Sequence, residues 1–143
     1  MTARSLVIAT VVALASLVGC SGPGPGPFQQ PVPGAQSVTE WGEMEPVDVG
    51  PNGMGASSLD EVVEIIRGMQ AASFANAQVE SSVDGDESDS AAVAYFRTIP
   101  QGDHPLQALD LRVGLIHRED GWHIQSMEQR YHCSGEVATD FCQ

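Results

Sequence analysis

Four histidines are the side chains of this chain best suited to bind a metal ion or to transfer a proton near neutral pH. They are His104, His117, His123 and His132. His117 and His123 flank a predicted hairpin turn, but their spacing should point them to opposite faces of a sheet. Neither a His-x-x-x-His helix nor a carboxylate in fixed register accompanies any of the four. We therefore expect scattered strand and surface histidines and no metal site.

Carboxylates and hydroxyls are the next candidates for chemistry. The acidic turn from Asp84 to Ser90 could ligate calcium, but Ser88 and Asp89 stand where an EF-hand loop needs an acid and a glycine. A solvated turn is therefore the favoured interpretation. No Gly-x-Ser-x-Gly stretch occurs, so no serine carries the signature of an activated nucleophile. Because no convincing catalytic signature is present, an enzyme is not the favoured interpretation.

Arginine supplies all the side-chain positive charge, because the chain contains no lysine. Arg97, Arg112 and Arg130 could gather on one face of the predicted sheet and bind an anion. They could equally form ion pairs with the many acidic residues. We favour the ion pairs.

A helix is the first element predicted to position these side chains. Ser58 and Glu61 match a capping box, in which each side chain bonds a free backbone amide of the first turn. The apolar residues that follow recur at helical spacing: Leu59, Val62, Val63, Ile66 and Met69. The pattern predicts an amphipathic helix of about 12 residues, with one face directed at a sheet.

Strands are predicted over residues 78–83, 92–99, 109–115 and 122–132, from their β-forming residues and their alternation. Glu119-Asp120-Gly121 should form a hairpin turn. Met127 breaks the alternation that runs through Trp122 and Ile124, which indicates a β-bulge near Ser126. The sequence thus predicts an α+β fold, with one amphipathic helix packed on a four-stranded antiparallel sheet.

The stretch "RVGLIHREDGWHIQSMEQ", from Arg112 to Gln129, resembles the final hairpin of cystatin-like and NTF2-like domains. A cystatin-like sheet around one helix fits the length better, and the protease-binding motifs of cystatins are absent. An NTF2-like domain would instead imply a pocket between helix and sheet, lined by Tyr95, Phe96 and Trp122.

The N-terminus has the pattern of an export signal. Arg4 precedes an uncharged apolar run from Leu6 to Val18, which is shorter than the roughly 20 residues of a membrane-spanning helix. Leu17-Val18-Gly19-Cys20 resembles the lipobox of bacterial lipoproteins. The resemblance implies a signal peptide over residues 1–19 and a covalent lipid on Cys20, with acyl chains such as palmitate that anchor the chain in a membrane.

Residues 20–57 are rich in proline, glycine and acids and are expected to form a disordered tether. Within it we expect Trp41 to be solvated, although docking of Trp41 and Met44 on the domain or on a partner is an alternative. The folded domain is expected over residues 58–143. With Cys20 lipidated, Cys133 and Cys142 remain as an even pair in an exported chain, so we expect a disulfide that pins the C-terminal tail rather than free thiols.

Charge limits the classes of partner. The net charge is −13, and loss of Arg4 with the signal peptide leaves five arginines against nineteen acids. Such a surface repels nucleic acid and anionic headgroups. No cofactor other than the lipid is indicated. We therefore expect a lipid-anchored, non-catalytic binding or scaffold module of the cell envelope, on the extracytoplasmic side, that contacts an envelope protein or polymer. The alternative is a small-ligand carrier or an enzyme with an NTF2-like pocket.

Overall fold

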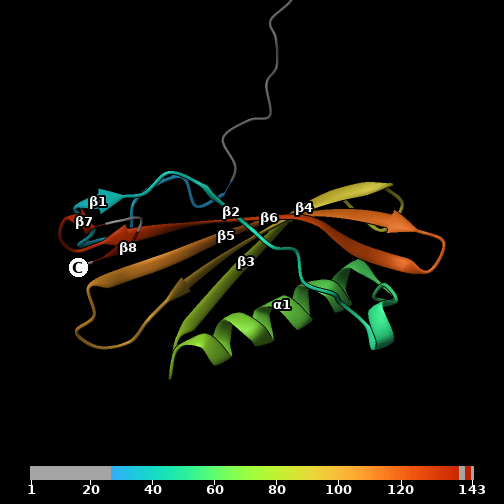
Figure 1. Ribbon diagram of the computed structural model, residues 1–143, viewed down its shortest axis with the longest axis horizontal. Coiled ribbons are helices and arrows are strands. Elements are labelled where there is room, and N and C mark those ends of the chain that lie inside the picture. The colour runs from blue at the N-terminus through green and yellow to red at the C-terminus, as the bar shows by residue number, and fades with distance from the viewer. Residues whose placement is uncertain (1–26, 139–140, 143) are drawn as a thin grey trace, which may run out of the picture.

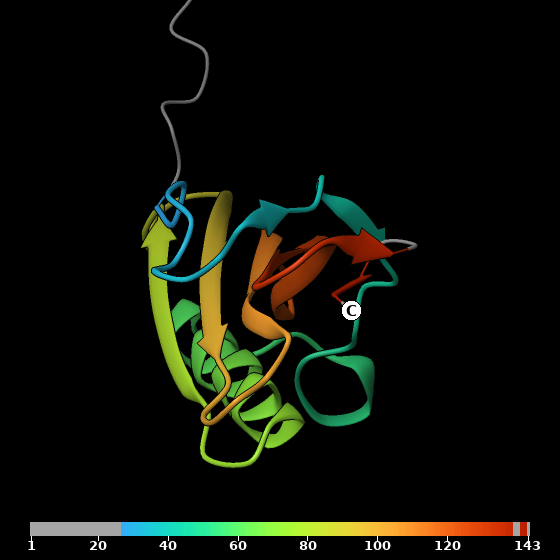
Figure 2. The ribbon, with the colours of Figure 1, turned by 90° about the vertical axis from the view of Figure 1, so that its left-hand side faces the viewer.

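The structure, a computed structural model, describes residues 27–138 and 141–142. Its architecture is α+β, as expected: an antiparallel sheet carries one α-helix, α1, on one face (Figure 1). Seen from the side, α1 lies under the sheet, inside its curve (Figure 2). No helix in these residues is both long enough and apolar enough to span a membrane. The expected signal peptide and Cys20 lie outside the described residues.

Helix α1 (Leu59–Ser73) begins at the predicted cap. The Ser58 side chain accepts a hydrogen bond from the Glu61 amide, and the Glu61 carboxylate accepts from the amide of Ser57 at 2.6 Å. Leu59, Val62, Val63 and Ile66 are buried against the sheet. These four residues pack as predicted, whereas Met69, the last residue of the predicted stripe, is 42% exposed. The helix runs one turn beyond Met69, to Ser73.

The four predicted strands are confirmed as β3 (Gln78–Asp84), β4 (Ala91–Ile99), β5 (Leu106–Arg118) and β6 (Gly121–Cys133). Each pairs with the next in antiparallel fashion. The core lies between this sheet and α1, where Phe96, Leu111, Val113, Leu115 and Trp122 are almost completely buried. Alternation along β4, β5 and β6 thus directs one set of side chains to the helix and the other set to the opposite face.

The β5–β6 hairpin contains the expected bulge. Gly114 pairs with Ser126 but Leu115 pairs with Ile124, so Gln125 is the additional residue. The turn requires a glycine after it, because Gly121 has φ of +121° and an added Cβ would lie 2.3 Å from the carbonyl oxygen of Ala56. The segment at Ala56 bonds to Trp122 through both backbone groups, at 2.8 and 2.9 Å.

The structure corrects the expected extent of the tether and the number of strands. Two further strands, β1 (Ser37–Val38) and β2 (Gly42–Met44), pair antiparallel with the outer side of β6, which makes a six-stranded sheet. Val49 and Ala56 are buried. The proline and glycine content that suggested disorder is accommodated here because the strands are short and lie at the sheet edge, where few backbone groups need partners. Residues 28–57 therefore belong to the folded domain.

The C-terminal tail is pinned by the expected disulfide between Cys133 and Cys142, whose Cα atoms lie 5.2 Å apart. It closes the loop that holds the two-stranded hairpin of β7 (Val137–Ala138) and β8 (Phe141–Cys142). The Gln36 amide donates to the carbonyl of Cys133 at 2.7 Å, so the same point also holds the N-terminal segment.

We expect Cys142→Ser to lower the free energy of unfolding by about 2–3 kcal/mol, because the variant loses a small closed loop in its unfolded state. Cys142 is preferred to the fully buried Cys133 because serine there stays near solvent. Thermal melting of the oxidised proteins measures the loss, and melting of both proteins after reduction is the control. Equal melting temperatures of the oxidised wild type and the oxidised variant would contradict the disulfide.

Candidate functional site

The face of the sheet away from α1 carries a cluster of charged side chains. Strand pairing places Arg97 beside Asp110 and Asp110 beside Arg130, one residue from each of β4, β5 and β6. His132 lies two residues after Arg130 and so joins the same face. We call these four residues the arginine cluster. Its members come from three strands, and the register of the sheet brings Arg97, Asp110 and Arg130 side by side.

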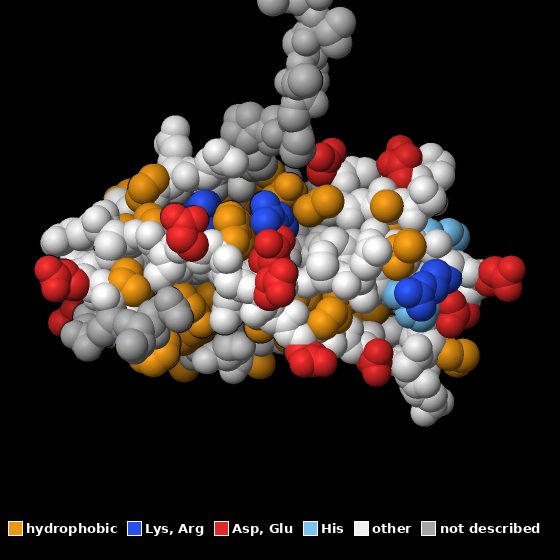
Figure 3. Space-filling model, turned by 45° about the horizontal axis from the view of Figure 1, so that its top comes forward, with side chains coloured by type: hydrophobic (Ala, Val, Ile, Leu, Met, Phe, Trp, Pro, Cys, Tyr) orange, Lys and Arg blue, Asp and Glu red, His pale blue; other side chains and the backbone are white. Residues whose placement is uncertain are grey.

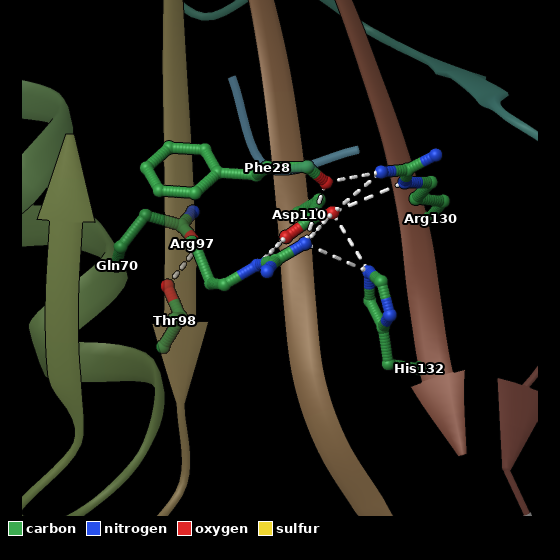
Figure 4. Close-up of polar contacts among 7 residues, drawn as sticks. All are labelled: Phe28, Gln70, Arg97, Thr98, Asp110, Arg130 and His132. Atoms are coloured by element: carbon green, nitrogen blue, oxygen red, sulfur yellow. Dashed lines mark hydrogen bonds and ion pairs between the residues drawn. The ribbon is translucent and has the colours of Figure 1, made fainter. Parts of the chain in front are cut away.

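Asp110 is the centre of the arginine cluster (Figure 4). Arg97 donates to Asp110 from both Nε and Nη2, at 2.7 and 2.8 Å. Arg130 donates from Nε at 3.0 Å, and His132 Nε2 lies 2.7 Å from the same carboxylate. Asp110 and His132 are 1% and 0% exposed. The carboxylate is thus surrounded by donors and removed from water.

Opposing effects act on the pKa of Asp110. Burial alone would raise it, but the hydrogen bonds and positive charge of Arg97 and His132 lower it from 3.8 to about 2. Asp110 is therefore ionised across the whole physiological range. A carboxylate held in this state is an ion-pair partner and a poor general acid.

The same two arginines fasten the N-terminal segment. Arg97 and Arg130 each donate from Nη2 to the backbone carbonyl of Phe28, both at 2.6 Å. The Arg97 guanidinium also lies over the Phe28 ring, 5.1 Å from its centre. Phe28 has φ of +64°, a left-handed conformation that a non-glycine residue keeps only where its surroundings impose it. The arginine cluster supplies those surroundings.

A second ion pair lies next to the arginine cluster. Arg112 Nε and Glu128 are 2.7 Å apart, and this hydrogen bond lowers the pKa of Glu128 and raises that of Arg112. The guanidiniums of Arg112 and Arg130 both lie over the Trp41 ring, 4.7 Å from its centre. Trp41 thus docks on the domain, which was the less favoured alternative. We call residues 28–44 the strap, because Phe28 and Trp41 hold them across this face.

The strap borders two open grooves. The larger, of about 540 Å³, lies where the strap meets β6 and the C-terminal hairpin, and we call it the strap groove. Its lining residues are Val38, Thr39, Glu40, Trp41, Gly42, Glu43, Gln129, Tyr131 and Val137. The smaller, of about 440 Å³, lies at the end of β2 and is lined by Glu43, Met44, Pro46 and residues 125–128 of β6. Both grooves exist only because the strap is folded against the sheet.

The expected pocket residues are not brought together. Phe96 and Trp122 are 0% exposed and fill the core, whereas Tyr95 pairs with Arg112 on the opposite face. Adjacent residues of a strand point to opposite faces, so Tyr95 and Phe96 cannot line one cavity between helix and sheet. The Trp122 indole donates to Glu87 at 2.9 Å. Phe96 and Trp122 thus pack in the space where the NTF2-like alternative would have a pocket.

The candidate metal ligands are also separated. His117 pairs with Trp122 and His123 pairs with Ile116, so the two point to opposite faces, as expected. In the part of the chain that the structure describes, no three His, Cys, Asp or Glu side chains gather to form a metal site. The acidic turn is more than a solvated loop, because Glu87 accepts from both the Leu59 amide and the Trp122 indole. It therefore joins the start of α1 to the β5–β6 hairpin.

The sequence patterns did not predict the strap groove. The pairing of Arg97, Arg112 and Arg130 with acids was anticipated and is confirmed by their contacts with Asp110 and Glu128. The signal that could have revealed the strap is Trp41, an aromatic residue among four acids in an otherwise unpatterned stretch.

In comparisons with protein-family models, with curated proteins and with solved structures, the chain matches none of them.

We expect Asp110→Asn to lower the free energy of unfolding by about 3–5 kcal/mol, because it leaves two arginines beside a buried neutral group. The matched control is Glu128→Gln, whose ion pair is partly exposed and should contribute at most about 1 kcal/mol. Urea unfolding of both variants measures the difference. Equal losses in the two variants would show that Asp110 is not the central residue.

The pKa of Asp110 also predicts a pH dependence. Because its folded pKa lies near 2 and its ordinary value is 3.8, its contribution to stability is complete above about pH 4 and is lost as the pH falls through 2. The wild type should therefore lose about 2 kcal/mol more than Asp110→Asn between pH 4 and pH 2. Parallel pH profiles of the two proteins in urea unfolding would argue against this assignment.

Proposed function

We propose that this protein is a lipid-anchored, non-catalytic binding module on the extracytoplasmic side of a cell envelope, with a cystatin-like fold. The observation that carries the binding role is the strap groove, an open surface shaped by a segment that the domain holds in place. An enzyme or carrier of the NTF2-like kind would need space between helix and sheet, and Phe96 and Trp122 occupy that space.

The extracytoplasmic placement is supported by two independent features of the chain. The sequence from Leu17 to Cys20 resembles a lipobox, and the Cys133–Cys142 disulfide is of a kind that persists mainly in oxidising compartments. The acidic composition disfavours nucleic acid as a partner. The membrane, through the lipid on Cys20, and an envelope protein or polymer remain as the proposed partners.

The docked strap shortens the length of chain that connects the proposed lipid anchor to the folded domain. Only eight residue-to-residue steps lead from Cys20 to Phe28, where the arginine cluster fastens the chain. Fully extended, they reach at most about 29 Å, against roughly 130 Å for a free tether from Cys20 to Ser57. The proposed module is therefore held close to the bilayer, with the strap nearest to its anchor.

Metabolic labelling tests the anchor directly. We expect cells expressing the wild type with a clickable fatty acid to yield labelled protein in the membrane fraction. Cys20→Ala should yield unlabelled protein, because it removes the only thiol at the lipobox. The mass of the intact mature chain gives an independent measurement of the modification.

A matched control for labelling is Cys142→Ser, which removes a thiol elsewhere and should retain the label. An unlabelled wild type would refute the lipid anchor. Label that persists in Cys20→Ala would place the modification elsewhere in the chain.

A further inference from the structure

The strap groove combines apolar and aromatic surface with a rim of acids. Val38 and Val137 border it and are 38% and 37% exposed, although both are large apolar residues. Trp41 and Tyr131 contribute half-buried rings to the lining. Exposed aliphatic groups beside aromatic rings in one concave surface are typical of sites that receive a side chain from a partner.

The charge at the rim is negative and is not balanced within the groove. Glu40 and Glu43 line it, and no lysine or arginine does. Among the described residues, neither glutamate takes part in an ion pair. Arg112 and Arg130 lie behind Trp41, but their charge is directed to Glu128 and Asp110. The rim therefore offers two carboxylates to an incoming group.

The wider surface has the same sign. In the space-filling view, red acidic side chains are spread over the visible face, whereas blue arginine side chains lie in only a few places (Figure 3). Between residues 28 and 57 the chain has four acids, Glu40, Glu43, Glu45 and Asp48, and no basic residue. A second copy of this chain, or an anionic polymer, would therefore meet like charge at the strap.

We propose that the strap groove binds a cationic segment of a partner protein. Lysine or arginine side chains of the segment lie beside Glu40 and Glu43, and an apolar side chain enters between Val38, Trp41 and Val137. This inference deepens the proposed binding role and rests on it. Because the anchor is short, the segment that fits is one presented close to the membrane.

The experiment uses the full-length chain in a non-ionic detergent and three blocked pentapeptides. The probe alternates lysine with leucine, and the two controls alternate lysine with serine and glutamate with leucine. Calorimetric titration measures affinity, and tryptophan emission locates binding, because Trp41 lines the groove whereas Trp122 is completely buried. Titration into micelles without protein is subtracted.

We expect the lysine–leucine peptide to bind more tightly than either control peptide and to change the emission of Trp41. Glu40→Gln with Glu43→Gln should weaken this binding about three- to tenfold, as expected for two solvent-exposed charge pairs. The matched control is Glu80→Gln with Asp84→Asn on β3, at the opposite edge of the sheet, which changes the net charge equally. That control should leave the affinity within about twofold of wild type.

Equal weakening by the two double variants would show that net charge alone attracts the peptide and would overturn the proposal. Equal binding of all three peptides, or no binding of the lysine–leucine peptide, would overturn it as well. Thermal melting of each variant confirms that it is folded. The titration does not depend on whether Cys20 carries a lipid, so failure of the groove and failure of the anchor give different results.

Discussion

The ion pairs of Asp110 with Arg97 and Arg130 are the interaction on which the rest of this structure depends. A carboxylate that is 1% exposed is costly to bury, and it is tolerated here because hydrogen bonds from three side chains surround it. The arginines have donors left over, and these bind the Phe28 carbonyl. One buried charge therefore joins three strands to a segment some seventy residues earlier in the chain.

The strap that results has two consequences on different scales. Locally, it adds two short strands to the edge of β6 and covers charged side chains that would otherwise face water. At the scale of the proposed envelope, it converts a long flexible connection into a short one. The strap, which forms part of the strap groove, is also the part of the folded domain that follows Cys20 most closely in sequence. The proposed binding and the proposed anchoring would therefore depend on the same contacts of Phe28 with the arginine cluster.

Local patterns predicted the parts of the fold that depend on neighbouring residues. Helix α1 followed from Ser58, Glu61 and an apolar stripe, and the bulge followed from the misplaced Met127. The strap could not be predicted in this way, because β1 and β2 have two and three residues and are held by pairing with distant positions of β6. Composition suggested disorder there, and tertiary contacts outweighed it. The pocket of the alternative interpretation conflicts with a local rule, because alternation along a strand separates Tyr95 from Phe96.

The arrangement of charge links the fold to its proposed role. A chain with six arginines and nineteen acids has few cations to distribute. The structure pairs Arg97 and Arg130 with buried Asp110, and Arg112 with partly exposed Glu128. Because these arginines are paired with Asp110 and Glu128, they do not pair with the acids of the strap. The interior is thereby stabilised while the exterior stays negative, so the stability of the strap and the charge of the groove have the same cause. A partner of opposite sign would complete the charge balance that the chain leaves open.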